Sequence, residues 1–124
     1  MLHRFKPINN NDLIFVTGAN GMVGSAIIRC LNQRNYKKIL KPDSSELDLR
    51  KQNDVESYLE KHKPDYIFNC AGKVGGIKAN NNYKADFLYD NLFIQLNLIH
   101  GAYKNKIYNL MNFGSSCIYP KECN

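Results

Sequence analysis

Short apolar runs alternate along this chain with longer segments in which apolar residues recur every three or four positions. Apolar runs of this kind predict strands, and they cover residues 12–18, 37–40, 65–72 and 107–114. Helical spacing of apolar residues is found between the runs, over residues 22–34, 52–62 and 83–104. The pattern therefore predicts the element order β-α-β-α-β-α-β.

The predicted strands are apolar almost without interruption, as in "DLIFVTG" (residues 12–18) and "DYIFNCAG" (residues 65–72). Such runs are typical of a sheet that is covered on both faces. Because β-α-β crossovers are right-handed, the element order predicts an α/β fold with a doubly wound parallel sheet. Ligands of such sheets bind beyond the carboxyl ends of the strands. Glycines and polar residues of this chain follow the strands at those ends.

Composition and charge narrow the class of protein. The chain has 124 residues, of which 44% are hydrophobic, and this suits one domain with a real core. No apolar run approaches the roughly 18 residues of a membrane helix, and the first ten residues lack the apolar stretch of a secretory signal. We therefore expect a cytoplasmic protein without a membrane partner.

The net charge of +6 is compatible with an anionic partner. The basic residues are scattered, however, and no nucleic-acid-binding motif or aromatic stacking platform is present, so a nucleic-acid partner is not expected. None of the four cysteines forms a CxxC pair, so we expect free thiols and no metal site.

A glycine-rich loop, "VTGANGMVG" (residues 16–24), follows the first predicted strand and opens the first predicted helix. Its glycines allow a sharp turn and a close approach of the backbone to a ligand. The helix that follows offers unpaired N–H groups to a pyrophosphate. The alternative is a structural turn without a ligand. The candidate cofactor-binding residues of this loop are Gly18, Asn20, Gly21, Met22, Val23 and Gly24.

The spacing G-x-x-G-x-x-G resembles that of the extended short-chain dehydrogenase/reductases, which act on nucleotide sugars. "NCAG" (residues 69–72) resembles the stretch that lies beside the nicotinamide ribose in that superfamily, and "LDL" (residues 47–49) resembles its adenine-side segment. The resemblance implies a Rossmann-like domain that binds NAD(P). It adds five candidate cofactor-binding residues, which are Asp48, Leu49, Ala71, Gly72 and Lys73.

Two further stretches, "AGKVGGIKANNNY" (residues 71–83) and "GSSCIYPK" (residues 114–121), together resemble the GDP-L-fucose synthase family. Members of that family are epimerase-reductases that convert GDP-4-keto-6-deoxymannose to GDP-L-fucose with NADPH. The resemblance implies two catalytic residues. Ser115 would hold the C4 oxygen of the sugar, and Cys117 would exchange a proton with the ring. A thiol is suited to this exchange because its reference pKa of about 8.5 lies near neutrality. Taken without the resemblance, Cys117 is equally well a buried strand-end thiol.

The chain lacks parts of the family's catalytic apparatus. It contains no Tyr-x-x-x-Lys pair, no matching histidine and no sugar-binding C-terminal part. We therefore expect residues 1–124 to be the N-terminal part of an NAD(P)-binding Rossmann domain without a substrate domain, and to be inactive alone. A non-catalytic dinucleotide-binding module, or an enzyme acting on another GDP-sugar, remains the alternative.

The choice between NADP and NAD depends on the segment after the second predicted strand, "LKPDSSELDL" (residues 40–49). Lys41 is a candidate partner for the 2′-phosphate of NADP, whereas Asp43 suits the ribose hydroxyl of NAD. The basic position of the family falls on Ser44. The resemblance favours NADP, and NAD stays possible.

The family forms homodimers through a bundle of two helices from each subunit, and residues 83–104 match the first of these. The apolar face of this helix is then expected to be exposed, since its second helix would follow residue 124.

Overall fold

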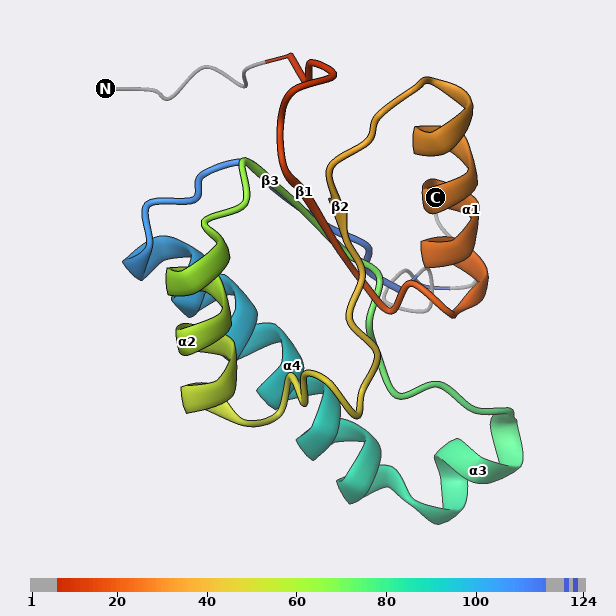
Figure 1. Ribbon diagram of the computed structural model, residues 1–124. Coiled ribbons are helices and arrows are strands. Elements are labelled where there is room, and N and C mark those ends of the chain that lie inside the picture. The colour runs from red at the N-terminus through yellow and green to blue at the C-terminus, as the bar shows by residue number, and fades with distance from the viewer. Residues whose placement is uncertain (1–6, 116–119, 121, 123–124) are drawn as a thin grey trace.

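One four-stranded parallel sheet forms the centre of the computed structural model, which describes residues 7–115, 120 and 122 (Figure 1). All neighbouring strands pair in parallel, in the order β2-β1-β3-β4. The strands are β1 (Ile14–Thr17), β2 (Ile39–Leu40), β3 (Tyr66–Asn69) and β4 (Leu110–Asn112). The predicted parallel sheet is confirmed.

Helices cover both faces of the sheet, as Figure 1 shows. The helix α1 (Met22–Gln33) packs on one face, and α2 (Gln52–His62) and α4 (Lys84–Lys104) pack on the other. The alternation of side chains along β1 explains this arrangement, because Ile14 and Val16 point toward α1 whereas Phe15 points toward α2 and α4. The doubly wound, Rossmann-like architecture is therefore confirmed.

The structure also corrects the expected elements. The strands are shorter than the runs 12–18, 37–40, 65–72 and 107–114, because strand pairing ends sooner than the apolar composition does. β1, for example, ends where Gly18 turns the chain with a φ of 60°. A short helix that the pattern did not predict, α3 (Ile77–Asn82), precedes α4. None of its residues is buried, so its sequence has no apolar periodicity from which the helix could be predicted.

On α4 many of the large apolar side chains are exposed, although hydrophobicity alone would place them on the buried face. Small and polar residues form much of its buried face, where Gly101 allows α2 to approach so closely that an added Cβ would lie 3.0 Å from Leu59 Cδ1. Six large apolar side chains on the helix are instead between 48% and 71% exposed, and five of them recur every three or four residues along one row. We call these five the α4 stripe, and they are Leu88, Leu92, Leu96, Ile99 and Tyr103. The expected exposed apolar face is thus confirmed. No described helix is long and apolar enough to span a lipid bilayer.

Candidate cofactor-binding site

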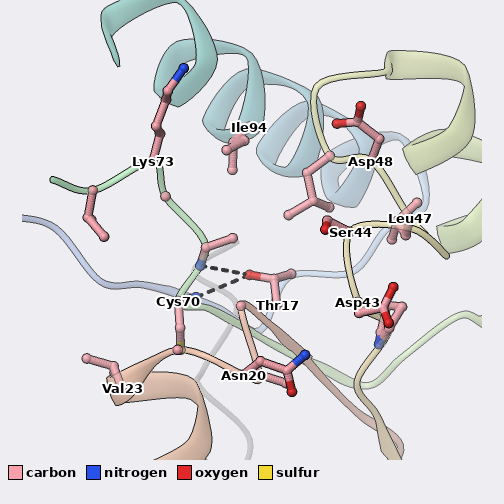
Figure 2. Close-up of a pocket in the computed structure, with 18 of the residues that line it drawn as sticks. Thr17, Asn20, Val23, Asp43, Ser44, Leu47, Asp48, Cys70, Lys73 and Ile94 are labelled. Carbon is pink, nitrogen blue, oxygen red and sulfur yellow. Dashed lines mark hydrogen bonds between the residues drawn. The ribbon is translucent and has the colours of Figure 1, made fainter. Parts of the chain in front are cut away.

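A cavity of about 680 Å³ opens beyond the carboxyl ends of β1 and β3 (Figure 2). Its wall is built from the glycine loop, the segment after β2, the segment after β3 and the first half of α4. Most residues that the sequence predicts as cofactor-binding line this cavity: Gly18, Asn20, Gly21, Met22, Val23, Asp48, Leu49, Ala71, Gly72 and Lys73. The structure thus brings together three segments that are far apart in the sequence.

The glycine loop is tightly folded against the end of β3. Gly18 has the positive φ that favours glycine, and a Cβ added there would lie 2.7 Å from the carbonyl oxygen of Cys70. The N–H of Gly21 donates to the Gly18 carbonyl at 2.9 Å and closes the turn. Gly24 is buried and does not line the cavity, but a Cβ added to it would overlap the Gly18 carbonyl oxygen. Its lack of a side chain therefore lets α1 start close to the loop.

The N-terminus of α1 has no side-chain cap. Its N-cap residue, Gly21, makes no side-chain capping bond, and its first turn contains no acidic residue. Since the first N–H groups of a helix have no partner within the helix, they and the helix dipole attract an anion. Met22 and Val23 bring this helix end to the cavity wall. The geometry suits a pyrophosphate group.

A ladder of polar side chains joins the carboxyl ends of three neighbouring strands beside the cavity. The strand register places Thr17 beside Asn69, and Asn69 beside Asn112. The Thr17 hydroxyl donates to Asn69 Oδ1 at 2.7 Å, and Asn69 Nδ2 donates to Asn112 Oδ1 at 2.7 Å. Thr17 Oγ1 also accepts the N–H groups of Cys70 and Ala71, each at 3.2 Å, as the dashed lines in Figure 2 show. The segment that follows β3 is therefore held in place by a side chain of β1.

Apolar side chains form a slot on the side of the cavity away from the glycine loop. Phe15, Leu47, Leu49 and Ile94 of α4 line it, and Leu47 and Ile94 are labelled in Figure 2. A slot of this kind suits a flat aromatic ring, because the ring can bury both of its faces against hydrocarbon. The carboxylate of Asp48 stands at its edge.

Charged side chains link the cavity wall in a row that we call the ion-pair row, made of Asp48, Arg50, Asp90 and Lys73. Lys73 Nζ lies 2.7 Å from Asp90 Oδ2, and Arg50 Nη1 lies 3.5 Å from Asp90 Oδ1. The hydrogen bond from Lys73 lowers the pKa of Asp90, and that from Arg50 lowers the pKa of Asp48. Both carboxyls are therefore ionised near neutral pH.

Sequence reasoning named neither Arg50 nor Asp90, and it also missed Thr17. The two charged residues are separated by 40 positions and meet only in the fold. Thr17 carried a usable signal, since it is a polar residue at the end of an apolar strand, where parallel strands bring polar ends together.

The remaining residues named from the sequence differ in their placement. The side chain of Lys41 is exposed and does not line the cavity, whereas Asp43 and Ser44 do. Asp43 Oδ1 accepts three hydrogen bonds within its own turn, and the one from the Ser45 hydroxyl lowers its pKa most. Ser115 is exposed and follows β4. Cys117 lies outside the described residues.

Comparison with known proteins gives a consistent set of relatives. Residues 14–124 match the model of the NAD dependent epimerase/dehydratase family. The chain is 51% identical over 108 residues to GDP-L-fucose synthase 1 of Arabidopsis thaliana, a match that covers 87% of this chain and 33% of the relative. It is 46% identical over 110 residues to GDP-L-colitose synthase of Yersinia pseudotuberculosis, covering 89% of this chain and 35% of the relative.

The solved structure of MlghC, a GDP-mannoheptose C4 reductase from Campylobacter jejuni with NADP bound, superposes with a TM-score of 0.89 at 34% identity. This match covers 95% of this chain and 35% of the reductase. The chain therefore spans about a third of the length of the proteins that it resembles.

Proposed function

The chain belongs to the NAD dependent epimerase/dehydratase family, and from this membership we propose that it is the N-terminal, cofactor-binding part of a GDP-sugar epimerase-reductase. The observation that carries the proposal is the cavity at the carboxyl ends of the strands, where a tight glycine loop meets an uncapped helix N-terminus. The relatives named as GDP-L-fucose synthase and GDP-L-colitose synthase support the substrate class.

Each wall of the cavity has a role in this proposal. The N-terminus of α1, at Met22 and Val23, holds the pyrophosphate of a dinucleotide. The apolar slot takes the adenine ring, and Asp48 accepts a hydrogen bond from its amino group. The segment from Ala71 to Lys73, which Thr17 holds in place, borders the nicotinamide ribose. When bound, the cofactor supplies the hydride for reduction of a ketone.

We propose NADPH as this cofactor, with NADH as the alternative. The NADP-bound reductase of similar structure supports NADPH. The cavity wall itself contributes little to the choice, because the described residues that line it include only Arg50 and Lys73 as cations, and both are engaged in the ion-pair row. A 2′-phosphate near Ser44 would therefore meet a hydroxyl group rather than a free cation of the cavity wall.

The proposed reaction of the whole enzyme is the conversion of GDP-4-keto-6-deoxymannose to GDP-L-fucose. Epimerisation removes and returns a proton on ring carbon, which we assign to Cys117, and Ser115 donates a hydrogen bond to the C4 oxygen. Ser115 follows β4 and so belongs to the same edge of the sheet as the cavity. Reduction then adds hydride to C4 and leaves an alkoxide that needs a proton donor. Because the sequence has no Tyr-x-x-x-Lys pair, we propose that these 124 residues alone do not catalyse reduction.

The α4 stripe supports a further part of the proposal, which is self-association. Its five large apolar side chains form one exposed row along a helix of 21 residues. An exposed apolar row of this kind is typical of an interface rather than of a solvated helix face. We propose that it packs against the same helix of a second copy in a homodimer.

Calorimetric titration of the chain with NADPH and with NADH tests the cofactor assignment. Gly21→Val should abolish binding, because the new side chain blocks the approach of a pyrophosphate to the helix N-terminus. Gly76→Val is the matched control, since a Cβ there meets no atom within 4 Å and the site is remote from the loop. Equal binding by the wild type and Gly21→Val would overturn the assignment, as would a wild-type chain that binds neither dinucleotide.

A further inference from the structure

Asp48 and Arg50 form a two-point ion pair at the edge of the apolar slot. Arg50 Nε donates to Asp48 Oδ1 and Arg50 Nη2 donates to Asp48 Oδ2, each at 2.9 Å. Paired parallel hydrogen bonds of this kind fix the plane of a carboxylate as well as its position. The side chain of Asp48 is only 24% exposed, so this plane is set within the cavity wall.

The hydrogen bonds that the Asp48 carboxylate accepts within the protein leave one of its lone pairs available to a ligand. An ionised carboxylate has about four lone pairs that can accept. Asp48 Oδ1 accepts two hydrogen bonds, from Arg50 Nε and from the Arg50 backbone N–H at 3.1 Å, and Oδ2 accepts one. Among the described residues no other donor reaches this carboxylate, so one lone pair of Oδ2 remains. The carboxylate can therefore recognise one further N–H group.

Arg50 is itself held from the opposite side. Its Nη1 lies 3.5 Å from Oδ1 of Asp90, whose side chain is 13% exposed. The other oxygen of Asp90 is held by Lys73 at 2.7 Å. Asp90 belongs to α4, so the guanidinium is tied to that helix, and Asp90 is in turn held by Lys73 of the segment after β3. This restricts the rotation of the Arg50 side chain and, through it, that of Asp48.

We propose that Arg50 is a positioning residue that orients the Asp48 carboxylate toward the amino group of a nucleobase, and thereby makes the cavity select adenine over hypoxanthine. The proposal rests on the dinucleotide-binding function proposed above. Adenine has an N–H donor at its exocyclic position, whereas hypoxanthine has a carbonyl oxygen there. A carbonyl oxygen facing the remaining lone pair of Oδ2 would gain no hydrogen bond and would be repelled by the charge.

The experiment compares the affinities of the chain for NADPH and for deamino-NADPH, its hypoxanthine analogue, by calorimetric titration. A hydrogen bond to a charged group is worth enough to predict at least about tenfold tighter binding of NADPH by the wild type. Arg50→Gln should reduce this ratio to about threefold or less, because the freed carboxylate rotates. Arg50→Lys keeps the charge but loses the two-point geometry, and its ratio should fall close to that of Arg50→Gln.

Lys104→Gln is the matched control, because it removes one positive charge and one exposed ion pair, with Glu56, outside the cavity. Its selectivity ratio should equal that of the wild type. Circular dichroism establishes that each variant is folded, and Arg50 is sufficiently exposed, at 51%, for both substitutions to be tolerated.

Three results would overturn the inference in different ways. An unchanged ratio in Arg50→Gln would show that Asp48 needs no positioning, while the dinucleotide function would stand. A wild-type ratio in Arg50→Lys, with a reduced ratio in Arg50→Gln, would show that charge rather than geometry matters. A wild-type chain that binds neither NADPH nor its analogue would overturn the proposed function together with the inference.

Discussion

Replacement of Thr17 by valine removes the hydroxyl that joins β1 to the segment after β3. Valine has nearly the same shape, so no cavity is created at this site, which is only 2% exposed. Ala71 N–H keeps a second acceptor, Asn69 Oδ1, at 3.3 Å, but Cys70 N–H loses its only acceptor among the described residues. An unsatisfied buried group costs about 1–3 kcal/mol. We therefore expect Thr17→Val to lower the free energy of unfolding by about 2 kcal/mol.

Urea denaturation followed by circular dichroism measures this loss, and the melting temperature should fall by roughly 5–10 °C. Amide hydrogen exchange provides the more specific test, since the Cys70 amide should exchange faster in Thr17→Val. Thr17→Ser is the control, because it loses a methyl group, at a cost of about 1 kcal/mol, but keeps the hydroxyl and the slow exchange of Cys70. Wild-type stability together with unchanged exchange in Thr17→Val would refute the reasoning.

Three further predictions follow from other parts of the structure. Gly24→Ala should lower the free energy of unfolding by about 1–3 kcal/mol, because the new Cβ overlaps the Gly18 carbonyl oxygen; a wild-type urea midpoint would contradict this. The hydrogen bond from Lys73 holds the pKa of Asp90 below its ordinary value of 3.8. The stabilisation that ionised Asp90 provides is therefore complete above pH 3.8 and is lost as the pH falls through the folded-state pKa. The urea midpoint of Asp90→Asn should accordingly decline less steeply below about pH 4 than that of the wild type. Leu96→Glu should weaken self-association in sedimentation measurements without unfolding the chain, and an unchanged mass would exclude the α4 stripe as the interface.

The sequence was sufficient for the sheet and for the glycine loop because both depend on local signals. Buried parallel strands need continuous apolar runs, and the turn at Gly18 needs a residue that tolerates positive φ. The ends of the elements were predicted less accurately than their existence. The run 37–40, for example, was predicted as a strand, but β2 is limited to the two residues that pair with β1. α3 buries nothing and so leaves no hydrophobic pattern.

Residues that depend on tertiary proximity were missed. The ion pair between Arg50 and Asp90 forms between segments 40 positions apart, and the role of Thr17 depends on its register with Asn69. The assignment of Lys41 to a phosphate stays a prediction, because a position just after a strand end does not fix the direction of a long side chain, and Lys41 is exposed beside the cavity lining rather than part of it. The apolar pattern of α4 was also ambiguous, since Gly101 and Ala102 form part of its buried face whereas the larger residues remain outside.

The helix α4 takes part in two surfaces at once. Asp90 and Ile94 line the cavity, and the neighbouring Leu92 and Leu96 belong to the exposed stripe. In the proposed homodimer, if pairing of the stripe displaces this helix, it also displaces Asp90 and Ile94, and occupation of the cavity and pairing of the stripe are then thermodynamically linked. Linkage is reciprocal: if association tightens cofactor binding by some factor, then bound cofactor tightens association by the same factor. The two cavities of the proposed homodimer, joined through this helix, would in that case sense each other's occupancy.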